Sequence, residues 1–407
     1  MAAGVLVRRV VPGALIPLLM MAATACGASA GSEAAVAAKP EHRAADGAFA
    51  HPGVLVGKDQ LAAAREHVRR KQEPWFSAYR EMSRSKYADL DYEAKPYATV
   101  RCPFDAEAGQ GCVEEREDAI AAYTQALLWN ITRDRAHAAK AVEIMNAWSD
   151  KVTGHTADNA GLQAAWAGAS WAKAGELMQY TYEDWPDGQE LKFQRMLREA
   201  YLPEVRGGSA DFNGNWDLVM ADATMSMGVY LNDRSAFDQA VGHFRARVPA
   251  YFYLASDGPL PVRPKGSGID TPAELRTYWF GQKTFKDGLS QETCRNFKHA
   301  SYSLAATSHM AETAWHQGVD LYGEVKDRLA AALELHSKYQ LGAKAPAWLC
   351  GGKVQRDMGP DTEVGLQHLQ GRLRMDLPQT ERLTRKERPE GTDDLFVAWE
   401  TLTHAAA

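Results

Sequence analysis

The stretch from Gln291 to Tyr302 brings an arginine, an imidazole and a phenol together at helical spacing. At about 100° per residue, Arg295, His299 and Tyr302 fall within roughly 60° of one another on a helix surface. Glu292 lies one turn earlier on nearly the same face. The segment is otherwise apolar, so this polar face indicates either a site for chemistry or a buried hydrogen-bond network.

A second polar group, Asn213-Gly214-Asn215-Trp216, stands just before an apolar segment of helical period. Asparagine commonly caps helix N-termini, so capping is one role that this position predicts for Asn213 and Asn215. The free N–H groups and the dipole of a helix N-terminus also favour a bound carboxylate. We therefore also expect the two amides to contact an acidic ligand, with Trp216 as a wall for a sugar ring.

A third group begins at His155 and runs into a helix carrying Gln163, Trp166 and Trp171. Aromatic faces suit the C–H-rich faces of sugar rings, although most tryptophans simply fill cores. A single histidine before a helix is more often structural than catalytic until a site geometry supports it. Gln163, Trp166 and Trp171, together with Glu292, are candidate substrate-binding residues.

These residue types fit the β-elimination of a 4-linked uronate. The C5 proton is barely acidic while the neighbouring carboxylate is charged, so Asn, Arg or protonated His must neutralise that carboxylate in the transition state. Tyr302 is the candidate proton acceptor and donor, and Arg295 is the cation expected to lower its pKa. Asn213 or Asn215 would neutralise the carboxylate, and the reaction requires neither a metal nor an organic cofactor.

Helical periodicity covers most of the chain, and long alternating Val, Ile and Thr runs are missing, so an all-α fold without a large sheet is predicted. Successive antiparallel helices build bundles, solenoids or closed α/α toroids, and no strict internal repeat is visible. The Pro- and Gly-rich segment 251–268 is the main irregular insert. The predicted helices are 59–70, 74–85, 114–129, 135–148, 159–182, 189–202, 216–230, 235–247, 291–317, 323–339 and 362–373.

The N-terminus predicts export. Arg8 and Arg9 precede a short apolar run broken by prolines, and small residues follow to position 30, which is typical of a signal peptide over residues 1–30. Cys26 offers a lipoprotein acylation site, so the exported chain would be either secreted or anchored at the cell surface. Residues 31–48 are rich in small residues and predict a flexible tether.

Charge and cysteine content limit the partners and the compartment. The formal net charge of the 407 residues is -6, which argues against a nucleic-acid partner held by bulk electrostatics. Nothing in the sequence indicates a protein partner. Besides Cys26 there are four cysteines, which suit an oxidising compartment, although buried free thiols are the alternative. Cys102 and Cys112 flank a turn-rich loop and could bridge it, which would leave Cys294 to pair with Cys350.

The sequence resembles alginate lyases with α/α toroid folds. The resemblance rests on Arg295 and Tyr302 seven residues apart, on Asn213-Gly-Asn-Trp216 and on three further stretches, and it extends from about residue 50 to residue 404. These stretches are Leu162-Gln-Ala-Ala-Trp166 with Ala174-Gly-Glu-Leu177, Ala311-Glu-Thr-Ala-Trp-His-Gln-Gly-Val-Asp-Leu-Tyr322, and Glu363, His368 with Trp399-Glu-Thr-Leu-Thr-His404. It implies a single toroid domain (an incomplete α/α barrel) over residues 49–407 and a secreted polysaccharide lyase.

One motif departs from the family pattern. Members that cleave polymannuronate carry Asn-Asn-His where this chain reads Asn213-Gly214-Asn215, without the histidine. Either Tyr302 serves as both base and acid, or His155 or His299 supplies an imidazole from elsewhere. The departure leaves the polymer open between alginate, in particular polymannuronate, and another β-1,4-linked uronate such as glucuronan.

Two other functions remain open from the sequence. A toroidal glycoside hydrolase would need two carboxylates about 5 to 9.5 Å apart across the scissile bond. The available carboxylates are Asp217, Asp222, Glu292 and Glu363. A non-catalytic sugar-binding lipoprotein is the other alternative, and acylation at Cys26 would suit it.

Overall fold

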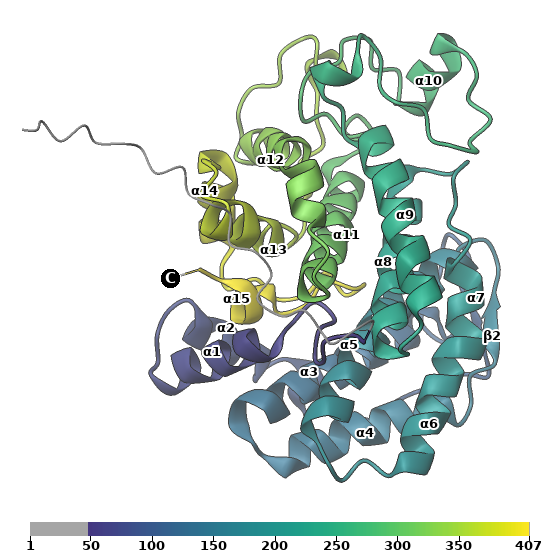
Figure 1. The fold of residues 1–407 in the computed structure, drawn as a ribbon, viewed down its shortest axis with the longest axis vertical. Helices are drawn as coiled ribbons and strands as arrows, with labels where there is room; N and C mark the ends of the chain where they lie inside the picture. The colour runs from purple at the N-terminus through teal and green to yellow at the C-terminus, as the bar shows by residue number, and fades with distance from the viewer. Residues whose placement is uncertain (1–47, 407) are drawn as a thin grey trace, which may run out of the picture. The chain divides into compact units, whose positions relative to one another are not determined.

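Inner helices followed by outer partners form the body of the fold, and short turns join each pair (Figure 1). The computed structural model describes residues 48–406. Their arrangement is an α/α toroid. The pairs are α3 (Cys112–Thr132) with α4 (Arg135–Ser149), α5 (Ala160–Thr181) with α6 (Asp187–Met196) and α7 (Leu202–Val205), α8 (Gly214–Tyr230) with α9 (Arg234–Tyr251), and α11 (Phe297–His316) with α12 (Leu321–Gln340).

Shorter elements complete the ring. A π-helical turn (Gln367–Arg372) extends α13 (Glu363–Leu366), which lies against α11. The ring is completed by α14 (Pro378–Glu387), α15 (Glu400–His404), α1 (Lys58–Arg69) and α2 (Trp75–Met82). Within the described residues, the strands form one two-stranded parallel sheet of β1 (Thr99–Arg101) and β2 (Gly154–Thr156), in which Val100 pairs with His155.

The inner helices are buried on nearly every side, because their sequences are apolar or small all round rather than on one stripe. In α8 every residue except Trp216 is buried, and in α5 the run from Leu162 to Met178 is buried throughout. Alanine and glycine allow neighbouring helices to approach closely. A Cβ on Gly175, for example, would come within 2.7 Å of the Tyr230 ring. The periodic pattern of these helices is weak for this reason.

All inner helices run in the same direction, because each returns through an outer partner. Their N-termini therefore gather at one end of the ring. The long connections, residues 252–296 and 341–362, lie at that same end. They include α10 (Pro272–Tyr278) and a second apolar core around Trp279, Phe297 and Leu349. Loops at one end of a rigid scaffold are a common location for functional residues.

The all-α prediction is confirmed, and most predicted helices begin and end within a few residues of the observed ones. One boundary was wrong. The helix expected from Gln291 begins at Phe297, because the Asn296 side chain caps its first turn by accepting the His299 N–H at 3.0 Å. Arg295 therefore lies in the turn before α11.

The predicted cysteine pairs, Cys102–Cys112 and Cys294–Cys350, are both bridged. The export signal, the tether and the acylation site at Cys26 lie outside the described residues. Within residues 48–406, none of the helices has the length and apolar character needed to cross a membrane.

Candidate active site

His299 and Tyr302 lie on the first turns of α11, with their ring centroids 5.8 Å apart in an edge-on arrangement. Burial, Arg295 and Lys298 lower the pKa of His299 to about 4. The ring is therefore neutral near pH 7. Its Nδ1 lies 2.6 Å from Asn296 Oδ1, which can only accept, so Nδ1 carries the proton and Nε2 has a free lone pair.

The Tyr302 phenol stays protonated. Burial raises its pKa above the usual value, and the carboxylates of Asp393 and Asp361 raise it further, while Arg116 opposes them. This corrects the expectation that a cation, namely Arg295, would lower the pKa of Tyr302. Burial outweighs the cation, and the arginine that acts on the phenol comes from α3. A protonated phenol beside a neutral imidazole provides a proton donor and a proton acceptor.

Glu292 is fully buried and organises the residues in front of it. Its carboxylate accepts from Asn215 Nδ2 at 2.8 Å to each oxygen, from the Tyr251 hydroxyl at 3.0 Å and from Arg295 at 2.7 Å. The Arg295 side chain is 31% exposed, so it is held from behind while part of it remains open. Glu292, a candidate for substrate contact, is thus placed behind Arg295, and the Asn215 amide is occupied by it.

Side chains from residues 291 and 292 cap the N-terminus of α8. Gln291 accepts the Gly214 N–H at 3.0 Å, and Glu292 accepts the Asn215 N–H at 3.1 Å. Asn213 occupies the N-cap position, but its side chain makes no capping bond there. Its Oδ1 accepts from Gln291 at 3.3 Å, and its Nδ2 donates to no group within residues 48–406, so Asn213 keeps a donor for a ligand. Gly214 is required between the two asparagines because a Cβ would lie 2.0 Å from Tyr251.

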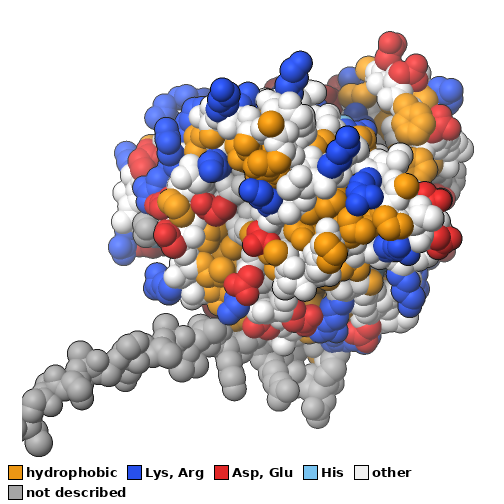
Figure 2. All heavy atoms as spheres, turned by 90° about the horizontal axis from the view of Figure 1, so that it is seen from above, with side chains coloured by type: hydrophobic (Ala, Val, Ile, Leu, Met, Phe, Trp, Pro, Cys, Tyr) orange, Lys and Arg blue, Asp and Glu red, His pale blue; other side chains and the backbone are white. Residues whose placement is uncertain are grey.

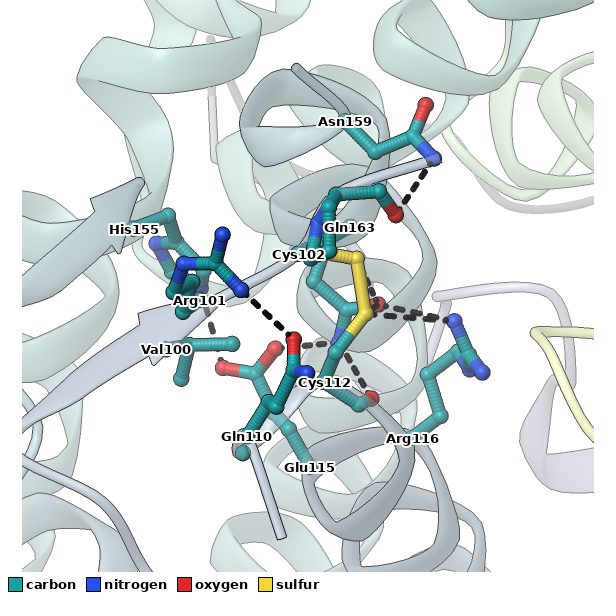
Figure 3. Close-up of a disulfide and its surroundings, with 12 residues drawn as sticks. Val100, Arg101, Cys102, Gln110, Cys112, Glu115, Arg116, His155, Asn159 and Gln163 are labelled. Atoms are coloured by element: carbon teal, nitrogen blue, oxygen red, sulfur yellow. Dashed lines mark hydrogen bonds and ion pairs between the residues drawn. A yellow bond between two sulfur atoms is a disulfide. The ribbon is translucent and has the colours of Figure 1, made fainter. Parts of the chain in front are cut away.

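Arg116, which the sequence analysis did not single out, comes from the first turns of α3. It donates to Gln163 Oε1 at 3.1 Å, and its guanidinium lies 5.4 Å from the Trp166 ring. Figure 3 shows Arg116 and Gln163 next to the Cys102–Cys112 bridge. Arg116 therefore lies beside two of the predicted substrate-binding residues, Gln163 and Trp166. The feature that could have indicated Arg116 in the sequence is its position one turn after the start of a helix.

Two predicted residues lie away from this group. His155 is buried, with Nε2 2.9 Å from Glu115 (Figure 3). Its Nδ1 lies 3.1 Å from the Ala200 carbonyl, so both ring nitrogens are occupied. Trp171 is fully buried and packs against Trp148 and Phe193. The structure gives both residues core positions, and neither contacts His299 or Tyr302.

Trp216 belongs to an aromatic group at the N-terminus of α8. Its ring lies 4.6 Å from Phe212 and 6.5 Å from Phe104, which extends from the disulfide-bridged loop. Phe212 is 42% exposed and Phe104 is 66% exposed. An exposed aromatic surface next to Asn213 suits the stacking of a sugar ring.

The C-terminal segment 391–399 supports Tyr302 from within the ring. Phe396 packs edge-on against Tyr302 at 6.3 Å, and its carbonyl accepts from the buried Lys173 at 3.0 Å. Asp393 Oδ1 accepts three consecutive backbone N–H groups at 2.9 Å each, which fixes this turn. Its Oδ2 is buried without a hydrogen bond.

The four carboxylates available for a hydrolase pair are all buried and paired with other side chains. Asp217 binds His243 and Arg247, Asp222 lies 3.3 Å from His309, and Glu363 binds Arg388. Glu292 is held as described above, so the structure provides no exposed pair among these four. Among the described residues there is also no cluster of three or more His, Cys, Asp or Glu placed to hold a metal ion.

Basic side chains surround the loops at this end of the ring. Segment 338–356 contains Lys338, Lys344, Lys353 and Arg356 and no acidic residue. Its Cys350 is bridged to Cys294, the residue before Arg295. Figure 2, seen from above the view of Figure 1, shows Lys and Arg side chains spread between apolar patches on this face. Segment 338–356 is thus locally basic in a chain whose net charge is negative.

Comparison with known proteins identifies relatives. The family model described as "Alginate lyase" matches residues 105–346, more than half of the chain. The fold is similar to that of alginate lyase A1-III from Sphingomonas species A1, with 14% identity, a TM-score of 0.58, and coverage of 87% of this chain and 96% of that one. A variant of that enzyme has been solved in complex with a tetrasaccharide, at a TM-score of 0.59 and the same identity and coverage.

An alginate lyase from Bacteroides ovatus is also similar, at 12% identity and a TM-score of 0.53, covering 88% of this chain and 100% of that one. No curated protein sequence matches the chain.

Proposed function

The chain belongs to the alginate lyase family and is a polysaccharide lyase, and we propose that it cleaves a β-1,4-linked polyuronate by β-elimination at His299 and Tyr302. The observation that carries this assignment is the neutral imidazole beside a protonated phenol on α11. Half-buried cations, Arg295 from the preceding turn and Arg116 from α3, lie in the same region.

The uronate carboxylate would be neutralised by Arg295 and by the free amide of Asn213. Arg295 is fixed by Glu292, so its orientation does not have to be established when substrate binds. Arg116 would hold the carboxylate of an adjacent unit, with Gln163 and Trp166 beside it. Trp216, Phe212 and Phe104 would stack against the chain. Asn215 would position Glu292 rather than touch the substrate.

In this proposal His299 Nε2 takes the C5 proton and the Tyr302 hydroxyl donates a proton to the leaving O4. The C5–H electron pair forms the C4–C5 double bond while the C4–O4 bond breaks. The free phenol is too weak an acid to supply phenolate near pH 7, whereas the imidazole is already in its basic form. Substrate carboxylate near His299 would raise its pKa and strengthen it as a base.

One turn of one helix supplies both groups, which suits the removal of proton and leaving oxygen from the same side of the sugar ring. β-Mannuronate and β-glucuronate present them in this way, while guluronate presents them on opposite sides. The tetrasaccharide complex of a structurally similar alginate lyase supports an acidic polysaccharide as substrate. We therefore propose polymannuronate or glucuronan ahead of polyguluronate.

We also propose that the chain is exported, either secreted or lipid-anchored at Cys26. Its two disulfides support an oxidising compartment.

The test is the ultraviolet absorbance of the unsaturated uronate product, followed over polymannuronate, polyguluronate, glucuronan, hyaluronan and heparan. We expect a rise on polymannuronate or glucuronan, and a loss of about 10³-fold in kcat for Tyr302→Phe. Tyr79→Phe, a half-buried tyrosine of α2, is the control and should be unchanged. Reducing ends released without absorbance would refute elimination, and full activity of Tyr302→Phe would refute its role.

A further inference from the structure

A cavity of about 300 Å³ lies at the opposite end of the inner helices from the candidate active site. It is bounded by α1, by the C-terminal ends of α3 and α5, and by residues near His51. Arg116 and Asn130 of α3 mark the two ends. Fourteen residues of helix place them about 20 Å apart. The cavity is therefore separate from the site at His299 and Tyr302. We name it the distal cavity.

Cations line the distal cavity without carboxylates. Lys58, Arg65 and Arg133 all border it, and no Asp or Glu is among its lining residues. The pKa of Arg133 is lowered by burial and by the nearby charge of Arg65. An anion bound beside the two guanidinium groups would offset this repulsion.

The structural roles of these cations use only part of each side chain. Arg65 Nε donates to the Asn130 carbonyl at 2.7 Å at the end of α3, and the Arg133 guanidinium lies 5.1 Å from the Trp129 ring. Within residues 48–406, the terminal nitrogens of both arginines and the Lys58 ammonium make no hydrogen bond or ion pair. These N–H groups remain available for a ligand.

An aromatic surface lies beside the cations. Tyr180 is 37% exposed and stacks on His51 with ring centroids 4.1 Å apart and an angle of 7°. His51 is fixed by Glu176 at 2.8 Å and Asn232 at 3.1 Å, and Glu176 also accepts the Gly53 N–H. The Glu176 carboxylate is therefore already bonded to His51 and Gly53. Tyr180 stacks on His51 with one face and leaves its other face open to a sugar ring.

We infer that the distal cavity is a second binding site for a uronate unit of the polymer that the enzyme cleaves. Three cations would bind the carboxylate, and Tyr180 would stack on the sugar ring. The cavity is larger than an inorganic anion requires, and its aromatic rim has no use in binding phosphate alone. This inference rests on the proposed function for the identity of the sugar. It adds a non-catalytic contact that would retain chains or products on the enzyme.

The experiment is a calorimetric titration with a saturated β-1,4-linked mannuronate disaccharide. The Tyr302→Phe full chain is used so that nothing turns over. We expect two binding equivalents. In that background, Lys58→Gln with Arg133→Gln should weaken one equivalent tenfold or more, and Arg116→Gln should weaken the other. Lys58 and Arg133 are exposed, so unfolding curves should match the parent.

The outcomes separate the inference from the proposed function. A single equivalent that only Arg116→Gln weakens overturns the distal site and leaves the active site intact. A single equivalent that only the Lys58/Arg133 change weakens supports the distal site and counts against the active site. No binding at either place overturns both.

Cellobiose and inorganic phosphate test the ligand chemistry, and Tyr180→Ala tests stacking. We expect Tyr180→Ala to weaken the disaccharide and to leave phosphate unchanged. Equal affinity for phosphate and disaccharide, unaffected by Tyr180→Ala, would show an anion site without sugar recognition and would overturn the assignment to a uronate.

Discussion

Charged groups are arranged differently at the N-termini of the inner helices and in the interior behind Tyr302. At the helix ends, Arg295 and Arg116 are half-buried, and each donates to a fixed side chain, Glu292 or Gln163. In the interior, Asp361, Glu390 and Asp393 have buried carboxylate oxygens without hydrogen bonds. Burial raises the pKa of all three carboxyl groups.

The comparison shows that this protein uses carboxyl groups in two ways. Glu292, at the helix ends, is surrounded only by donors and holds Arg295 as an ion pair. The interior acids are buried and each has an oxygen without a donor, so their pKa values are raised and they bind protons more readily than exposed carboxyl groups do. Paired cationic groups thus lie at the helix ends, and the acids behind Tyr302 have raised pKa values.

After Tyr302→Phe, the largest loss of activity is expected from substitution of His299. His299→Gln should lower kcat by about 10²-fold or more, because glutamine cannot accept the C5 proton. His67→Gln, on α1, is the control and should leave kcat unchanged. In the parent enzyme, kcat/KM should rise as the pH increases through about 4 and then stay level, since the pKa of His299 is about 4. If Tyr302 phenolate were the base, kcat/KM would keep climbing about tenfold per pH unit toward alkaline pH.

Glu292→Gln tests the charged carboxyl in the site region. The new amide would point its N–H groups at Asn215, Tyr251 or Arg295, all of which donate to Glu292. We expect the free energy of unfolding to fall by about 3 kcal/mol and KM to rise, because Arg295 loses its buried partner. Glu324→Gln breaks an exposed pair with Arg245 and should change stability by about 1 kcal/mol or less. Equal losses in urea denaturation would contradict the organising role of Glu292.

Much of the fold could be predicted from the sequence, since apolar runs with helical period are a local property. The pattern could not indicate where α11 begins. Gln291 and Glu292 continue the helical period, but their side chains cap α8, and only the tertiary structure brings the two segments together.

The candidate site was predictable where one segment carries it, as with His299 and Tyr302. It was less predictable where distant segments meet. Arg116 lies beside Gln163 and acts on Tyr302 only because α3, α5 and α11 converge, and a lone arginine on a helix has no distinctive pattern. Asp393 also acts on the pKa of Tyr302 from a turn near the C-terminus, which the local sequence could not indicate. His155 and Trp171 show the converse, since both residue types suit a sugar-binding site, but both side chains are buried in the core away from His299 and Tyr302.

The smallest expected effect concerns the interior carboxyl groups and the pH dependence of stability. Burial raises the pKa of Glu387 to about 7 and that of Asp393 to about 6. Between about pH 4 and pH 7 the folded state therefore holds more protons than the unfolded state, so stability falls as the pH rises through this window. Glu387→Gln removes one such group. It should raise the free energy of unfolding by about 1 kcal/mol at pH 8, after allowance for solvent screening, and leave it unchanged at pH 4.

Glu381→Gln is the control of opposite sign for Glu387→Gln, because bonds from Gln370 and Arg385 lower the pKa of Glu381. It should weaken the fold slightly at pH 8, and this loss should shrink as the pH falls below the usual pKa of a glutamate. Urea denaturation at several pH values measures both variants. If Glu387→Gln instead destabilised the protein at pH 8, the carboxyl of Glu387 would be a charged partner. The contrast between paired cations at the helix ends and interior acids with raised pKa values would then not extend to α14.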